Sequence, residues 1–203
     1  MSYTQLEAVD LGTVLKLFGA LFYYAPNQYQ NANLDVILAE QDVPFAALKT
    51  VMDAFGYSEV DLLQAEHDRL FAGLGDMPAP PWGSVYLDKE AVLFGESTVM
   101  YRQFLRECGV ALSSQQNEPE DQIGLMLMVA AMLLENDQHA QFKALLGEHL
   151  MPWFGYYMAE FKRAVESPAY ALLAEQTQEL LHSVCERDAI VPIQKRNYFN
   201  AIL

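Results

Sequence analysis

One segment of the sequence reads Met77-Pro78-Ala79-Pro80-Pro81-Trp82-Gly83-Ser84-Val85-Tyr86-Leu87-Asp88 and, after a short charged step, Leu93-Phe94-Gly95-Glu96-Ser97. Its three prolines lack the backbone N–H that a helix needs and fix φ near one value, so we expect a rigid, extended connection. The segment carries too much apolar surface for an exposed linker and should therefore lie against the rest of the protein. Such a loop is a candidate binding site. The alternative is that it only buries its aromatic side chains in the core.

On both sides of this segment, apolar residues recur at the helical period of 3.6, and no convincing alternating strand pattern occurs. The predicted helices span residues 5–24, 31–41, 44–55, 58–71, 97–109, 119–134, 138–150, 152–165 and 167–186. Residues 123–134 are so apolar that this helix should be central to the core. Residues 188–203 have no clear period and should form a docked or frayed tail. The sequence thus predicts an all-α, single-domain bundle of roughly nine to eleven helices over residues 1–203, with an extended proline-rich loop.

Several predicted helix ends carry capping residues. Ser58 begins a capping-box pattern, and Ser97 is placed to cap the helix that follows the proline segment. Gly56 and Gly109 can adopt the left-handed conformation that ends a helix. Pro119 fits a first helical turn, where its missing N–H is not needed.

Composition limits the classes of function. The chain has 203 residues, 52% hydrophobic and 19% charged, as in a folded globular protein. It has neither an apolar run of about 18 residues nor a basic, apolar leader, so we expect a cytoplasmic protein without stable membrane insertion. Twelve Lys and Arg against 27 Asp and Glu give a net charge of −15, and the scattered basic residues argue against nucleic-acid binding. The acidic surface favours cationic partners or serves solubility alone. Cys108 and Cys185, far apart in the sequence, fit reduced thiols.

The sequence offers no convincing catalytic or metal-binding pattern. Glu179-x-x-His182 is the only pair with the spacing used in metal-binding bundles, and two ligands do not make a site. No Walker lysine or complete dinucleotide motif occurs, and neither Ser84 nor Cys108 lies in a nucleophile motif. We therefore expect no cofactor and no metal.

An acidic turn reads Asn117-Glu118-Pro119-Glu120-Asp121. Asn117 or Glu118 can cap the following helix, and Glu120 and Asp121 favour the positive end of its dipole. Carboxylates held at a helix start beside an aromatic loop can also receive guanidinium groups through charge-assisted hydrogen bonds. Both roles stay open from the sequence.

Five motifs together resemble one known family. They are Gly19–Pro26, Pro78–Asp88, Leu93-Phe94-Gly95, the acidic turn 117–121 and Leu150-Met151-Pro152-Trp153, and they resemble the TorD/DmsD/NarJ family of redox-enzyme maturation chaperones. The resemblance implies a helical, cytoplasmic chaperone that binds the twin-arginine signal peptide of a molybdoenzyme catalytic subunit. It implies dimethyl sulfoxide reductase as the client, export delayed until the cofactor is inserted, and the Tat translocase as a further partner. Monomer and homodimer both remain open.

The resemblance also implies a peptide-binding groove with acidic residues at one end. The groove residues are Tyr23, Leu70, Phe71, Pro81, Trp82, Tyr86 and Gly95, with Pro119, Asp121 and Gln122 at the polar end. The family usually has His where this chain has Gln122, and close relatives have further tryptophans where it has His67 and Gly75. An enzyme using the same cleft and a structural assembly subunit are the alternatives.

Overall fold

The computed structural model describes residues 3–41, 43, 45–73, 77–90, 93–111 and 118–199. Position 44, the expected start of the third helix, and residues Gly75 and Asn117 lie outside this range. The α-helices are α1 (Ala8–Tyr23), α2 (Leu34–Leu38), α3 (Ala46–Gly56), α4 (Val60–Leu70), α5 (Gly83–Leu87), α6 (Glu96–Glu107), α7 (Ile123–Glu135), α8 (His139–Ala144), α9 (Met151–Ala164) and α10 (Pro168–Arg187). Two 3-10 turns, η1 (Tyr3–Gln5) and η2 (Pro26–Gln28), and a π-helical segment, η3 (Leu145–Leu150), complete the helical structure.

The predicted all-α fold of roughly nine to eleven helices is confirmed, because the described residues form ten α-helices. Their one strand-like feature is an isolated antiparallel bridge between Trp82 and Gln122. No helix in the described part of the chain is long and apolar enough to span a membrane.

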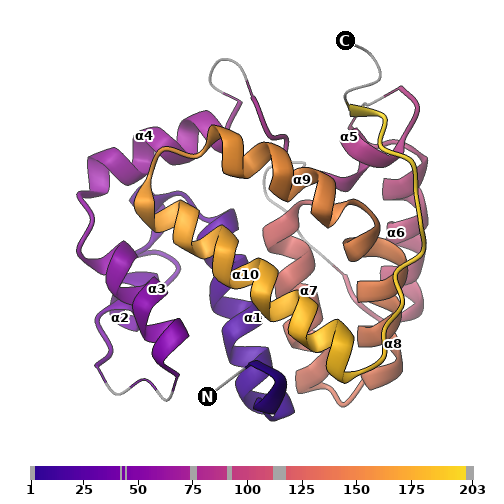
Figure 1. Cartoon of the computed structure of the whole chain (residues 1–203), viewed down its shortest axis with the longest axis horizontal. Helices are drawn as coiled ribbons and strands as arrows, with labels where there is room; N and C mark the ends of the chain where they lie inside the picture. Colours follow the sequence, from indigo (N-terminus) through magenta and orange to yellow (C-terminus); the bar gives the residue numbers. More distant parts are fainter. Residues whose placement is uncertain are drawn as a thin grey trace.

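The α1 and α7 helices pack side by side in the middle of the molecule (Figure 1). A Cβ atom built on Gly19 would lie 2.6 Å from the Gly124 carbonyl oxygen, and one built on Gly124 would lie 2.5 Å from the Gly19 carbonyl oxygen. Only glycine at both positions permits this approach, because a methyl group has no room between the two backbones. Most residues of α7 are buried, as its apolar sequence predicted.

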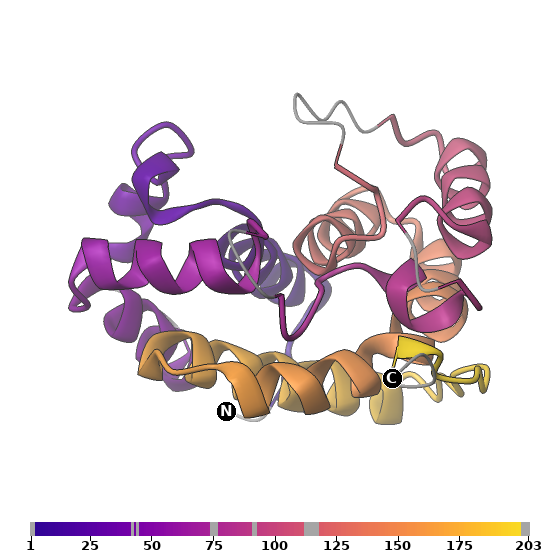
Figure 2. The same cartoon turned by 90° about the horizontal axis from the view of Figure 1, so that it is seen from above.

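The remaining helices surround this pair. Seen from above, α2, α3 and α4 lie on one side and α5 and α6 on the other, while α9 and α10 cover one face (Figure 2). Phe22 of α1 contacts Phe161 of α9, with ring centroids 5.9 Å apart. α3 contacts α10, and α5 contacts both α6 and α9. The α9–α10 layer therefore joins the two sides of the molecule across the central pair.

The proline segment is extended only as far as Trp82. Residues Gly83–Leu87 form α5, so the prediction that the whole segment is non-helical is wrong for these residues. After Pro81 the backbone N–H groups are again available. The Asp121 side chain accepts a hydrogen bond from the Ser84 N–H (Oδ2 to N, 2.6 Å) at the start of the helix. A carboxylate from a distant segment thus supports a helix that the local sequence does not predict.

Two predicted N-terminal caps are wrong because nearby groups engage the serines differently. The Ser58 hydroxyl donates to the Ala54 carbonyl oxygen, and α4 begins without it. α6 begins after Gly95, so Ser97 lies inside its first turn and donates its N–H and hydroxyl to Asp88. A Cβ on Gly95 would lie 2.0 Å from the Asp88 Oδ2 atom, which explains why glycine occupies this position.

Other helix boundaries also differ from the prediction. α2 is shorter than the expected helix 31–41, because Asn33 has a left-handed φ of +56° immediately before it. Gly56 is the last residue of α3 and is not left-handed, whereas Gly109, with φ of +74°, follows α6 as predicted. Pro119 lies before α7 rather than in its first turn, because the Gln122 side chain caps the helix and sets its start.

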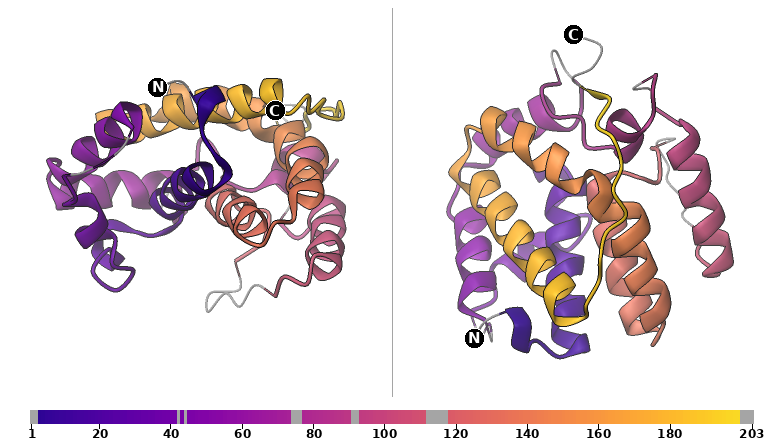
Figure 3. Two further views of the ribbon diagram at one scale, coloured as in Figure 1. Left: turned by 90° about the horizontal axis from the view of Figure 1, so that it is seen from below. Right: turned by 45° about the vertical axis from the view of Figure 1, so that its right-hand side comes forward.

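Residues 188–199 form a docked tail that runs from the end of α10 along η3 and α9 to α5 (Figure 3). The Ile193 N–H donates to the Gly147 carbonyl oxygen (2.9 Å) in η3. The Tyr198 N–H donates to the Tyr86 carbonyl oxygen (2.8 Å) in α5. Of the two alternatives, docked or frayed, the described part of the tail is docked.

Gly124→Ala should destabilise the protein by about 1–3 kcal/mol, because a methyl group there overlaps the backbone of α1. Gly155→Ala is the matched control, since a Cβ on this exposed residue inside α9 meets nothing within 4 Å. The free energy of unfolding of the control should rise by about 1 kcal/mol, because alanine has a higher helix propensity than glycine. Urea unfolding followed by circular dichroism measures both changes, and equal stabilities of the two variants would contradict the close packing of α1 on α7.

Candidate functional site

Trp82 is held in place by the turn that precedes α7. It pairs with Gln122 in the isolated antiparallel bridge. Next to the bridge, the Ile123 N–H donates to the Pro81 carbonyl oxygen (2.9 Å). The prolines before Trp82 restrict the chain on one side, and these backbone bonds fix it on the other. The sequence segments 78–82 and 118–123 therefore present their side chains together.

Trp82 borders a cavity of about 370 Å³, which we call the polar pocket, between the end of α1, η2, α4 and the turn before α7. Four of the predicted site residues meet there, namely Tyr23, Phe71, Trp82 and Gln122. The full lining consists of Tyr23, Ala25, Asn27, Gln28, Gln64, His67, Asp68, Phe71, Ala72, Trp82, Glu118 and Gln122.

Two carboxylates line the polar pocket. Glu118 accepts a hydrogen bond from the Trp82 indole N–H (Oε1 to Nε1, 2.7 Å). Burial raises the pKa of Glu118, the Trp82 bond opposes the rise, and the nearby Asp121 adds to it. Asp68 accepts from the Gln64 amide (Oδ1 to Nε2, 2.8 Å). Both acids therefore have their positions fixed by neighbouring side chains that also line the cavity.

His67 reaches the pocket from α4 and is only 6% exposed. Neither ring nitrogen meets a partner with hydrogen-bond geometry in the described residues, although the Tyr23 backbone lies near the ring. The ring packs on Phe71 with centroids 5.0 Å apart. Burial lowers the pKa of His67 to about 4, against a smaller opposing effect of Asp68. The imidazole is therefore neutral at physiological pH and does not repel a cation in the pocket.

Gln122 uses its side chain within the protein. Its Oε1 atom accepts hydrogen bonds from the N–H groups of Gly124 and Leu125, which makes it the cap of α7. Its Nε2 atom donates to the Phe22 carbonyl oxygen (3.2 Å) in α1. Gln122 therefore shapes the wall of the pocket and ties α7 to the end of α1.

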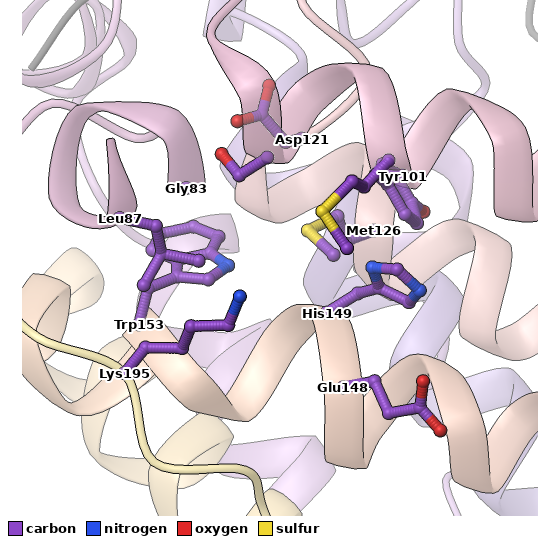
Figure 4. A pocket seen from close by; sticks show the side chains of 11 residues that line it. Gly83, Leu87, Tyr101, Asp121, Met126, Glu148, His149, Trp153 and Lys195 are labelled. Atoms are coloured by element: carbon purple, nitrogen blue, oxygen red, sulfur yellow. The ribbon is translucent and has the colours of Figure 1, made fainter. Parts of the chain in front are cut away.

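Asp121 is 3% exposed and points away from the polar pocket. Besides capping α5 through Ser84, it lines a separate cavity of about 30 Å³ with Tyr101, Trp153 and Lys195 (Figure 4). Burial raises the pKa of Asp121, and the hydrogen bond from the Ser84 N–H opposes that rise. The structure therefore places this carboxylate inside the protein at the start of α5, whereas the resemblance implies a position at the polar end of the groove.

Leu70 and Tyr86 lie in the core rather than in the pocket, and both are fully buried. Tyr86 stacks on Trp153, with centroids 5.8 Å apart, and its other neighbours include Tyr157 and Phe199. The docked tail thus covers a side chain that the sequence places at the binding surface. Burial raises the pKa of the Tyr86 phenol far above its usual value.

The three remaining predicted residues shape the backbone. Pro81 is buried and fixes the approach to Trp82, and Pro119 is buried in the turn before α7. Gly95 lies at the start of α6, where it leaves room for Asp88. None of the three lines the polar pocket among the residues that the structure describes.

Sequence reasoning missed part of the lining, namely Gln64, Asp68 and the pocket-facing side of Glu118. Glu118 lies in the acidic turn, for which the sequence leaves helix capping and guanidinium binding both open, but it is not among the groove residues that the resemblance implies. Gln64 and Asp68 are four residues apart on α4, and His67 lies between them, so the helical period puts them on one side of that helix. A polar side of this helix next to the predicted groove residues Leu70 and Phe71 is the sequence feature from which these lining residues could have been predicted.

The geometry suits a cationic group with a flat, forked shape. Glu118 and Asp68 supply acceptors, and Tyr23 and Trp82 supply aromatic side chains beside them, a combination that suits a guanidinium. A lysine ammonium would meet the same charges without the forked geometry or the stacking. The described residues contain no group of three or more His, Cys, Asp or Glu side chains placed to hold a metal ion.

Known proteins resemble the chain in sequence. The sequence model of the family described as nitrate reductase delta subunit matches residues 38–159. The Tat proofreading chaperone DmsD of Salmonella typhimurium is 37% identical over 202 residues, which covers 97% of this chain and 98% of the relative. The probable Tat proofreading chaperone DmsD of Haemophilus influenzae is 39% identical over 178 residues, covering 82% and 85%.

A solved structure shares the fold. The putative redox enzyme maturation protein from Archaeoglobus fulgidus superimposes with a TM-score of 0.59, covering 83% of this chain and 91% of its own, at 18% identity. That similarity supports the fold alone, whereas the family match and the relatives near 40% identity extend over most of the sequence. The chain therefore belongs to the TorD/DmsD/NarJ family of redox-enzyme maturation chaperones.

Proposed function

We propose that the chain is a cytoplasmic chaperone, folded as one domain over residues 1–203, that binds the twin-arginine signal peptide of a molybdenum reductase's catalytic subunit. Binding would hold back export until the client has folded and received its cofactor. The relatives named Tat proofreading chaperone DmsD support this assignment, and dimethyl sulfoxide reductase is the proposed client.

The observation that carries the proposal is the polar pocket itself. Glu118 and Asp68 face a cavity that Tyr23, Phe71 and Trp82 also line. We place the arginine pair of the leader there, with Glu118 in the role that the sequence had given to Asp121. The Trp82 indole N–H orients the Glu118 carboxylate, so the acceptor is in position before the peptide arrives. Such preorganisation favours affinity because less conformational freedom is lost on binding.

Glu118→Gln should weaken binding of a synthetic twin-arginine leader about tenfold, because the amide can still accept from Trp82 but no longer attracts a guanidinium by charge. Glu120→Gln is the matched control, since Glu120 pairs with Arg102 (2.6 Å) outside the pocket. The control should change affinity by less than about twofold. Isothermal titration at low salt measures both.

The same titration with a double-lysine leader separates general charge attraction from recognition of guanidinium. We expect the lysine leader to bind the wild type more weakly than the arginine leader does. Glu118→Gln should also reduce the affinity of the lysine leader by a smaller factor. Equal affinity of the two leaders for the wild type would contradict the proposed function. It would leave an assembly subunit or an enzyme acting on a small molecule as the better reading.

Leader affinity should be nearly constant between pH 7.5 and 6 and should fall below about pH 5. Gln122 does not titrate, and His67, with a pKa of about 4, stays neutral over the upper range. Below it, protonation of Glu118, whose pKa is raised by burial, removes attraction, and protonation of His67 adds repulsion. Asp68 and Tyr23 are the other titratable groups at the pocket.

Titrations at pH 7.5, 6, 5 and 4 measure this profile, while circular dichroism checks at each pH that the protein stays folded. Parallel titrations of Glu118→Gln and His67→Gln show which group causes the fall in affinity at low pH. Each variant should remove part of that fall. A large fall in affinity already between pH 7.5 and 6 would show that another group controls binding.

A further inference from the structure

A second and larger cavity, which we call the apolar groove, lies between α1, α2, α3 and α7 and has a volume of about 550 Å³. Its apolar lining includes Leu17 and Ala20 from α1, Tyr24 directly after α1, Ile37 from α2, Met52 from α3 and Met128 from α7. Three charged residues also line it, namely Lys16, Glu40 and Glu135, and Lys16 forms an ion pair with Glu135 (3.1 Å).

The groove opens on the face of α1 that α9 and α10 leave uncovered. Phe22 packs on Phe161 of α9, and residues two positions away in a helix point about 200° from it. Ala20 and Tyr24 therefore face away from the α9–α10 layer seen in Figure 2. Ile37 is 44% exposed at this opening, so the groove has an apolar wall in contact with solvent.

The apolar groove and the polar pocket are neighbours along the same two helices. Tyr23 lines the pocket and Tyr24 lines the groove, and their ring centroids are 5.0 Å apart. Gln122, the capping residue before α7, lines the pocket, and Met128, six residues further on in α7, lines the groove. Because α1 ends at the pocket and α7 begins there, the groove extends from the pocket toward the N-terminal end of α1.

The order of chemistry along this surface identifies the occupant. A twin-arginine leader carries two cations followed by an apolar segment, and the surface offers two carboxylates followed by an apolar channel. Met52 and Met128 have flexible, polarizable side chains, which suit an apolar ligand of variable sequence. An acidic pocket that adjoins an apolar groove thus matches one peptide in both charge and order.

We propose that the apolar groove binds the apolar segment of the same leader whose arginines enter the polar pocket, with the leader running antiparallel to α1. The proposal rests on the proposed function and adds to it a second site and a direction. The end of the apolar segment then lies near Thr13, which lines the far part of the groove. A second copy of the chain in the groove is the competing occupant.

The first test compares two neighbouring residues of α2. Ile37 lines the groove, whereas Val36, which is 67% exposed, does not. Ile37→Asp should lower the affinity for a full synthetic leader about tenfold, because it places a charge where an apolar side chain of the leader is buried. Val36→Asp should change that affinity by less than about twofold. A truncated peptide that ends after the arginine pair does not reach the groove. Its affinity should therefore change by less than about twofold in either variant.

The second test establishes direction by disulfide trapping. A leader with one cysteine after its apolar segment should cross-link to Thr13→Cys and much less to Thr50→Cys. Both threonines are exposed and donate to the carbonyl four residues earlier in their helices, so the substitutions are matched. The wild type gives the background, since Cys108 and Cys185 are buried.

The outcomes separate the two proposals. A full leader that binds through its arginines, but is equally affected by Ile37→Asp and Val36→Asp or cross-links equally to both cysteines, overturns the groove assignment and leaves the function standing. A leader that binds equally well with lysines overturns the proposed function instead. If Ile37→Asp abolishes a wild-type dimer in sedimentation without changing leader affinity, a second copy occupies the groove and the proposal is wrong.

Discussion

The close approach of α1 and α7 at Gly19 and Gly124 is the contact on which the rest of the structure depends. With the two backbones this near, the Gln122 amide reaches the Phe22 carbonyl oxygen, and the start of α7 is fixed against the end of α1. That arrangement places the turn before α7 beside Tyr23. A methyl group at either glycine would push the helices apart and lengthen the hydrogen bond between the Gln122 amide and the Phe22 carbonyl oxygen beyond its normal range.

Three residues of the turn before α7 have three different structural roles. Glu118 faces the polar pocket, Asp121 supports the start of α5, and Gln122 caps α7. Their side chains leave the turn in different directions because the backbone turns at Glu120 and Asp121, between Glu118 and Gln122. Acid groups close in sequence therefore have different surroundings, and only Glu118 combines a pocket-facing carboxylate with an aromatic donor.

Local signals predicted the long helices well, because α1, α9 and α10 carry an apolar period and a proline near one end, and α7 is almost entirely apolar. They failed for α5, whose start is supported by Asp121 from another part of the chain. Of the groove residues that the family resemblance implies, Tyr23, Phe71, Trp82 and Gln122 lie at one cavity. They could not show that Tyr86 is covered, since the covering residues lie more than a hundred positions later and have no helical period.

The docked tail has a consequence for the order in which the protein becomes complete. Residues 188–199 are synthesised after every element that they contact, and they close over Tyr86 and Trp153 beside the Trp82 loop. Until they emerge from the ribosome, the aromatic stack under α5 lacks part of its cover, and the loop rests on an unfinished support. The support beneath the Trp82 loop is therefore completed only after residues 188–199 have been synthesised.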